Sequence, residues 1–192
     1  GADKGNCAGS RTHIGNVRMG YVTPQLDNAV ANALLSDWRI AGVFSARSGG
    51  WLSVIAGRSG ANGQSARRRR ADQISDDVYG PGKDASDLGP GERINAYLTK
   101  AAFAQPPSNR IGDSVPFSIE GPRYMEVNMA VSKRIGLGAG ARTLELRVEA
   151  FNLFNTFNWG MPRDDFRRAN FGRIDSQAGS PRIFQFGIKY GF

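Results

Sequence analysis

The chain has 192 residues, and its 25 Lys and Arg residues outnumber its 17 Asp and Glu residues, which gives a formal net charge of +8. A composition of 40% hydrophobic and 10% aromatic residues excludes a disordered tail. One cysteine, Cys7, and one histidine, His13, exclude an internal disulfide framework and a cysteine or histidine-cluster metal site, so we predict neither metal nor cofactor.

Apolar and polar residues alternate with a period of two in the N-terminal part, which predicts strands with one apolar and one polar face. The first predicted strand lies near 12–22, the second over 38–47, and a shorter third over 51–56. Two short segments are helical candidates, Asp27–Leu35 and Asn95–Ala104. No apolar run approaches the roughly 18 residues of a membrane-spanning helix.

Alternation is clearest in the C-terminal part, which predicts three more strands over 124–135, 142–151 and 183–192. On the last strand one face carries Phe184, Phe186, Ile188, Tyr190 and Phe192. These runs of about nine to twelve residues match the roughly 9–11 that cross a bilayer at a tilt, whereas globular strands average about 5–6.

The connections between these strands alternate in length. Short ones occur at 48–50 and 136–141, and long ones at 23–37, 57–123 and 152–182. Transmembrane barrels have short periplasmic turns and longer extracellular loops. The pattern predicts an all-β fold, an antiparallel up-and-down transmembrane β-barrel segment of about six strands. Because the smallest bacterial barrels have eight strands, this barrel would be incomplete.

The stretch Leu144–Pro162, LELRVEAFNLFNTFNWGMP, resembles the late-barrel signature of TonB-dependent outer-membrane receptors. It is most similar to the Oar-like group, which has a carboxypeptidase-regulatory-like N-terminal domain. Further landmarks follow the family's order: SDWRIAGVFSARSGG at Ser36–Gly50, Gly121-Pro122 before the 124–135 strand, and Asn170-Phe-Gly172 before the last strand.

The resemblance implies that residues 1–192 are the C-terminal part of a transporter barrel in the outer membrane of a Gram-negative-type bacterium. Its function would be energised uptake of a bulky solute, with loops 57–123 and 152–182 at the extracellular mouth. Nothing in the chain resembles the N-terminal plug or the segment that engages TonB, so TonB would act through a region upstream. Outer-membrane lipid and lipopolysaccharide are the other expected partners.

The chain ends in a pattern that looks like the C-terminal assembly signal of outer-membrane barrels. Its positions are Gln185, Gly187, Tyr190 and Phe192. An apolar strand with a free edge is a template for strand addition, so we expect the barrel-assembly machinery to bind here.

Two groups of charged residues are candidate sites. One occupies the polar faces of the predicted strands, which would face the lumen of a barrel: Arg18, Glu126, Arg134, Glu145, Arg147, Glu149 and Lys189. The other is the run Arg67, Arg68, Arg69 and Arg70, predicted to lie in a loop. The run is either solvated or contacts lipid headgroup phosphates, and nucleic acid is not expected because no aromatic residues interleave with it.

No catalytic site is predicted, and we do not expect an enzyme. Glu145 and Glu149 would be about 13 Å apart along one strand, which exceeds the roughly 5–9.5 Å used in glycoside hydrolysis. Two alternatives to a transporter remain open. One is a passive porin or small structural barrel, with two further strands inside 57–123, and the other is a secreted β-sandwich binding module.

Overall fold

The computed structural model describes residues 4–59, 67–84, 92–107, 110–138 and 142–192. The chain forms two compact units. The sheet unit consists of Ile14–Ala46, Met125–Thr156 and Gly179–Phe192, and the loop unit of Gly1–His13, Arg47–Tyr124 and Phe157–Ala178.

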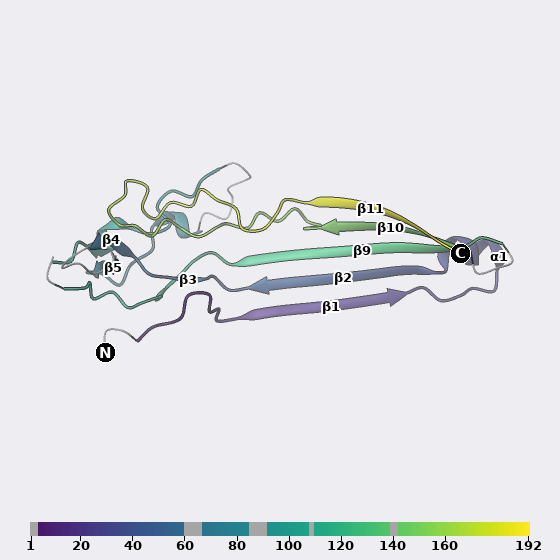
Figure 1. Cartoon of the computed structure of the whole chain (residues 1–192), viewed down its shortest axis with the longest axis horizontal. Coiled ribbons are helices and arrows are strands. Elements are labelled where there is room, and N and C mark those ends of the chain that lie inside the picture. Colours follow the sequence, from purple (N-terminus) through teal and green to yellow (C-terminus); the bar gives the residue numbers. More distant parts are fainter. Residues whose placement is uncertain (1–3, 60–66, 85–91, 108–109, 139–141) are drawn as a thin grey trace. The chain divides into compact units, whose positions relative to one another are not determined.

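The sheet unit is built on five strands that lie side by side (Figure 1). In spatial order they are β1 (Ile14–Val22), β2 (Trp38–Arg47), β9 (Tyr124–Gly136), β10 (Thr143–Phe151) and β11 (Ile183–Gly191). Strand β10 pairs antiparallel with both β9 and β11, and β1 and β11 are the edges of the sheet. The predicted all-β antiparallel fold is therefore confirmed, and the sheet of the described residues is open.

The strand register separates the side chains into two faces. Leu146 lies opposite Ile188 and Val148 lies opposite Phe186, so apolar residues meet across the β10–β11 pair. On the same face Phe186 is 79% exposed, which shows that no other part of the sheet unit covers it. The other face carries the charged residues of β10. Such a two-faced sheet is typical of a membrane barrel, whose outer face contacts lipid.

Strands β1 and β2 are connected through a short helix, α1 (Ala29–Leu35), which confirms the first of the two helical candidates. Asn28 caps it, because its side-chain Oδ1 accepts hydrogen bonds from the backbone N–H of Val30 and of Ala31, both at 3.0 Å. Among the residues that the structure describes, no helix is long and apolar enough to cross a membrane.

The predicted strand over 51–56 is not part of this sheet. Its residues divide between β3 (Trp51–Leu52), which pairs with β8 (Ile119–Glu120), and β4 (Ile55–Ser59), which pairs with β5 (Arg67–Arg70). The structural reason is a close backbone approach: a Cβ on Gly49 would lie 1.9 Å from the Gly121 carbonyl oxygen. Glycine permits this approach, and the Gly121 N–H donates to the Gly50 carbonyl oxygen at 2.8 Å, so the chain after β2 runs alongside 119–121 instead of folding into a hairpin.

This difference also changes the predicted alternation of the connections. The segment between β2 and β9 is one long connection, and 48–50 is not a separate short turn. The connections 23–37 and 137–142 join strands at one end of the sheet, and 48–123 and 152–182 join them at the other. The two longest connections therefore still share one end.

Those two long connections fold together into the loop unit, which has its own hydrophobic core. Backbone hydrogen bonds in both directions join Ile94 to Ile174, at 3.0 and 2.9 Å. Phe171 contacts both Phe103 and Phe166 edge-on, with ring centroids 5.7 and 6.1 Å apart. The buried core residues are Leu52, Val54, Ala56, Ala71, Val78, Ile94, Tyr97, Leu98, Ala102, Phe103, Ile119, Phe171 and Ile174.

In the part of the loop unit that the structure describes, regular structure is limited to short pieces. Besides the two pairs above, β6 (Asp72–Gln73) pairs with β7 (Phe103–Ala104). Two 3₁₀ turns occur, η1 (Pro81–Asp84) and η2 (Lys100–Ala102). The second helical candidate, 95–104, is therefore wrong, since it contains only the three-residue turn η2 and β7. The hydrophobic core and backbone hydrogen bonds between distant segments, rather than long elements, hold this unit together.

Asn152, just after β10, joins the two ends of the connection that leads to β11. Its backbone adopts φ +49° and its side chain is buried, with 2% of the residue exposed. The Nδ2 group donates to the carbonyl oxygens of Thr156 and Ser180, both at 3.0 Å, and Oδ1 accepts from Thr156 N–H at 2.9 Å. One asparagine thus ties both ends of the 152–182 connection to the sheet unit.

Candidate functional site

The charged face of the sheet unit brings together residues from three strands. Glu145 on β10 lies directly opposite Lys189 on β11 and Arg134 on β9. Arg147 forms an ion pair with Glu149 on the same strand, with Nη2 2.5 Å from Oε1. Opposite charges on neighbouring strands compensate each other, so this part of the face is polar without a large excess of either sign.

Arg18 and Glu126 lie on this same face. The Thr23 N–H donates to the Trp38 carbonyl oxygen at 2.9 Å, and the Arg134 N–H donates to the Asp37 carbonyl oxygen at 3.2 Å. These bonds set β1 against β2 and β2 against β9, and directly opposite residues share a face. All seven predicted charged residues are therefore on one side of the sheet. That this side is a lumen stays a prediction.

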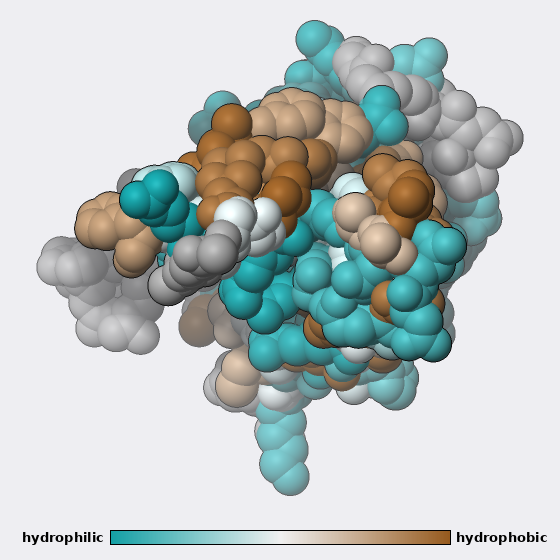
Figure 2. All heavy atoms as spheres, turned by 90° about the vertical axis from the view of Figure 1, so that its right-hand side faces the viewer, coloured by the Kyte–Doolittle hydropathy of each residue, from teal (hydrophilic) through white to brown (hydrophobic). Residues whose placement is uncertain are grey.

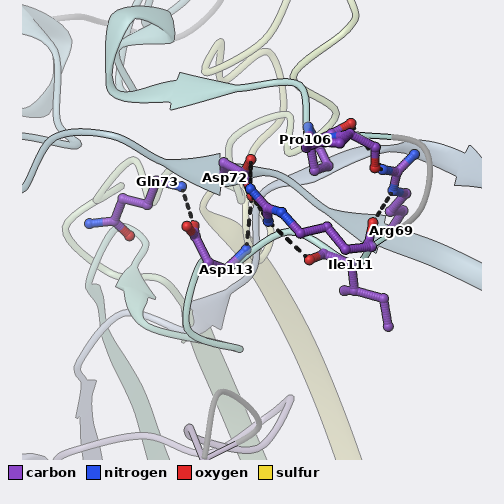
Figure 3. Close-up of polar contacts among 8 residues, drawn as sticks. Arg69, Asp72, Gln73, Pro106, Ile111 and Asp113 are labelled. Carbon is purple, nitrogen blue, oxygen red and sulfur yellow. Dashed lines mark hydrogen bonds and ion pairs between the residues drawn. The ribbon is translucent and has the colours of Figure 1, made fainter.

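The arginine run is not a loop: Arg67–Arg70 is strand β5. Arg69 folds back onto its own unit (Figure 3), where its guanidinium donates to the carbonyl oxygens of Pro106 at 2.9 Å, of Pro107, and of Arg110 at 3.1 Å. This side chain holds the 106–110 segment in place. Contact of the run with lipid headgroups stays a prediction, and for Arg69 the observed role is structural.

Next to Arg69, an ion pair fastens β6 (Figure 3). Both Arg110 Nη atoms donate to the Asp72 carboxylate at 2.6 Å, and the Asp113 N–H donates to Asp72 Oδ1 at 3.0 Å. Asp113 in turn accepts from the Gln73 N–H at 2.9 Å. The hydrogen bonds from Arg110 hold the pKa of the buried Asp72 carboxyl below its usual value. Such a bidentate pair is a fixed structural clamp.

The loop unit contains a pocket of about 750 Å³. It lies where β3, β4 and β5 meet the segments at 116–117, 161–164 and 176. One part of its lining is apolar: Trp51, Leu52, Ile55, Pro116, Phe117, Met161 and Pro162. The other part is polar: Ser53, Arg70, Arg163, Asp164 and Ser176. This volume falls within the roughly 300–1,000 Å³ of small-molecule sites.

Backbone contacts shape the pocket wall. The Phe117 N–H donates to Ser53 Oγ at 2.7 Å, and Phe117 itself adopts φ +49°. On the other side, the Ile55 N–H donates to the Asp164 carbonyl oxygen at 2.9 Å. A left-handed backbone is strained for an aromatic residue, and the hydrogen bond to Ser53 holds the Phe117 backbone in this conformation.

Arg163 lies at the polar side of the pocket, and an ion pair with Asp175 orients its side chain. Asp175 accepts from Arg163 Nη2 at 3.0 Å and from Arg173 Nη2 at 2.9 Å. The hydrogen bond from Arg173, followed by that from Arg163, lowers the pKa of the Asp175 carboxyl. The Arg163 side chain is still 57% exposed, so its guanidinium has donors left for a ligand.

Of the residues predicted as sites, Arg70 alone lines this pocket. The charged face and the C-terminal pattern belong to the sheet unit. Sequence reasoning missed the pocket because its walls come from six short, separated segments. Among the described residues, no three His, Cys, Asp or Glu side chains are grouped so that they would hold a metal ion.

Three of the four residues of the predicted assembly signal lie on the edge strand β11. Gln185 and Gly187 face Glu149 and Arg147 across the β10–β11 pair, and Tyr190 lies opposite Leu144 on the apolar face. Phe192 follows the end of β11 and is 96% exposed. The pattern is thus displayed on an unpaired edge, and its recognition by the assembly machinery stays a prediction.

Comparison with known proteins agrees with this architecture. The family model described as "Outer membrane beta barrel domain" matches residues 1–185. No curated protein and no solved structure matches the chain. The open antiparallel sheet, with one apolar and one charged face, is the structure expected for a segment of such a barrel. The chain therefore belongs to the outer membrane beta-barrel domain family and is located in the outer membrane.

Proposed function

We propose that the chain is the C-terminal part of a TonB-dependent outer-membrane transporter for energised uptake of a bulky solute, and that it is not an enzyme. The observation that carries the proposal is the loop unit: two long connections form one folded body with a core and a pocket of about 750 Å³. A passive pore needs no such body. The resemblance of Leu144–Pro162 to the TonB-dependent receptors supports the same function.

In this proposal the pocket makes the first contact with the solute. Its apolar side, with Trp51, Phe117 and Met161, fits a hydrophobic or aromatic body. Its polar side presents Arg70 and Arg163, and guanidinium groups bind carboxylates and phosphates. We therefore infer an amphipathic solute that carries an anionic group.

The sheet unit supplies part of the transmembrane wall. Its edges β1 and β11 need further strands, because an open sheet edge is not tolerated in lipid. The charged face would then line the lumen, where Glu145, Arg147 and Glu149 meet passing solute. The lipid bilayer, lipopolysaccharide, the assembly machinery and, through an upstream region, TonB are the proposed partners.

Conductance separates the transporter from a passive porin. We would insert the purified full-length protein into planar bilayers and, in parallel, measure its binding to the periplasmic domain of TonB. A plugged transporter barrel shows no steady conductance and binds TonB, because the plug fills the lumen. Steady open conductance without TonB binding would contradict the proposal and favour the porin.

A second experiment tests the pocket. Saturation-transfer NMR with naphthalene-2-carboxylate, and with its uncharged carboxamide, would be run on the full-length protein in detergent. We expect Arg163→Gln to weaken binding of the carboxylate by roughly tenfold, since one charge-assisted hydrogen bond contributes about 1.5–3 kcal/mol. Arg167→Gln is the matched control: its side chain is 54% exposed, also lies near an aspartate, Asp165, and does not line the pocket. Equal effects of the two variants would contradict an anion-binding pocket.

A further inference from the structure

Helix α1 exposes its apolar side chains and directs its polar side chain toward the rest of the chain, the reverse of a surface helix in a water-soluble protein. Its most exposed large hydrophobic residues are Val30 at 70% and Leu34 at 64%, which share one face because they are four positions apart. The one polar residue within the helix, Asn32, points the other way, and its Oδ1 accepts from the Leu26 N–H at 2.9 Å. A surface helix in water has the opposite arrangement, with polar residues outward.

Two side chains tie α1 to the apolar face of the sheet. Trp38, at the start of β2, donates its indole Nε1–H to the Leu34 carbonyl oxygen at 2.8 Å. The Lys133 ammonium donates to the Ser36 carbonyl oxygen and lies 5.6 Å from the centre of a Trp38 ring. Both residues therefore hold the C-terminal end of α1.

Lys133 is itself on the apolar face, since it lies opposite Leu146. Lys133 can lie among aliphatic residues because its ammonium group reaches past them to the carbonyl oxygen of Ser36, just after α1. Lysines at the border of a membrane extend their ammonium group toward the interface in this way, and tryptophan is enriched at the same level. The contact lies near the end of the apolar face, one pair before Ile135 opposite Leu144, and the C-terminal end of α1 lies at that level.

We propose that α1 lies in the boundary between headgroups and acyl chains of the outer membrane, as an interfacial anchor at this end of the sheet. Val30 and Leu34 then insert among the acyl chains, continuing the apolar face beyond the strands. Lipid covers the exposed helix face, because the helix adjoins the apolar, lipid-facing side of the sheet. The helix itself has no charged residue between Ala29 and Leu35. Seen from this end, hydrophobic residues gather in patches separate from the hydrophilic ones (Figure 2).

Fluorescence quenching tests the position of the helix. A bimane label would be placed at Leu34→Cys in the full-length protein, in a background without other cysteines that includes Cys7→Ser. The protein would be held in lipid nanodiscs, which leave both membrane surfaces accessible. Asp27→Cys, exposed and just ahead of the helix, is the matched control.

We expect a nitroxide at carbon 5 of the lipid acyl chain to quench the label at position 34 at least roughly twofold more than at position 27, with iodide showing the reverse order. Stronger iodide quenching at position 34 would place α1 in water. Absence of quenching by either reagent would mean that protein, either another part of the barrel or a second copy, covers the helix. Both results would overturn the proposal.

A second variant keeps the test independent of the label position. With bimane at Val30→Cys, Leu34→Glu should reduce quenching by the lipid nitroxide, because a charge at this depth is expelled toward water. Leu34→Met, which keeps an apolar side chain of similar volume, should leave the quenching unchanged. Equal quenching in the two variants would also contradict insertion.

Discussion

Asn152 combines a left-handed backbone conformation with a buried, hydrogen-bonded side chain. Two substitutions separate the contributions of the backbone and of the side chain to stability. Its side chain makes three hydrogen bonds, two to carbonyl oxygens and one from a backbone N–H. At about 1 kcal/mol each, their loss lowers the free energy of local opening by roughly 3 kcal/mol. Both substitutions lose these bonds, but Asn152→Ala keeps a Cβ at φ +49°, as asparagine does, whereas Asn152→Gly removes it and relieves roughly 1 kcal/mol of backbone strain.

Hydrogen exchange measured by mass spectrometry reports this opening directly, in segments 150–156 and 179–183 of the full-length protein in detergent. We expect exchange to accelerate by roughly 150-fold in Asn152→Ala and by about fivefold less in Asn152→Gly, since about 1.4 kcal/mol corresponds to a factor of ten. Asn155 is the matched control, as its backbone has φ +52° but its exposed side chain accepts one bond, from the Arg182 N–H. Identical exchange in the glycine and alanine variants would refute the assigned strain, and changes below about threefold in both would refute the hydrogen-bond argument.

Three further predictions concern the loop unit and the last strand. Because Arg110 lowers the pKa of Asp72, the ion pair stabilises the loop unit fully above the ordinary pKa of 3.8, and this stabilisation is lost as the pH falls below that value. Hydrogen exchange of the loop unit should therefore accelerate below this pH, and it should accelerate less in Arg110→Gln. Gly172→Ala should destabilise the loop unit by roughly 1–3 kcal/mol, visible as faster proteolysis, because φ is +72° and a Cβ would lie 2.4 Å from the Leu98 carbonyl oxygen; unchanged proteolysis would contradict this. Deletion of Phe192 should lower the amount of protein assembled in the outer membrane, measured by membrane fractionation, and normal assembly would remove it from the predicted signal.

The sheet was predictable because its chemistry repeats along each strand. On β10, four aliphatic residues alternate with Glu145, Arg147 and Glu149, and this period of two determines which side chains share a face. The helix at 29–35 was also predictable, as part of the short candidate Asp27–Leu35. The direction of its apolar face was not, because it depends on the contacts of Asn32 and Trp38 with distant parts of the chain.

The loop unit was not predictable, since its structure depends on pairings that leave no local pattern. Trp51–Ala56 has the composition of a strand, but the close approach of Gly49 to Gly121 decides which segment becomes its partner. The arginine run has the composition of a solvated loop, and its pairing with β4 appears only in the fold. The pocket follows from both features and was missed with them.

The core of the loop unit combines residues from both long connections, which determines when this unit can fold during biogenesis. Ile94 and Ile174 are hydrogen-bonded neighbours, yet the whole β9–β10 hairpin lies between them in the chain. The loop unit therefore cannot complete its core until that hairpin has been synthesised and the segment after it lies on the same side of the membrane as 48–123. Contacts of such long sequence separation form late, after their loop-closure entropy has been paid. Until then the apolar residues of 48–123 remain exposed, and this segment is where we expect chaperones and proteases to act on an unfinished barrel.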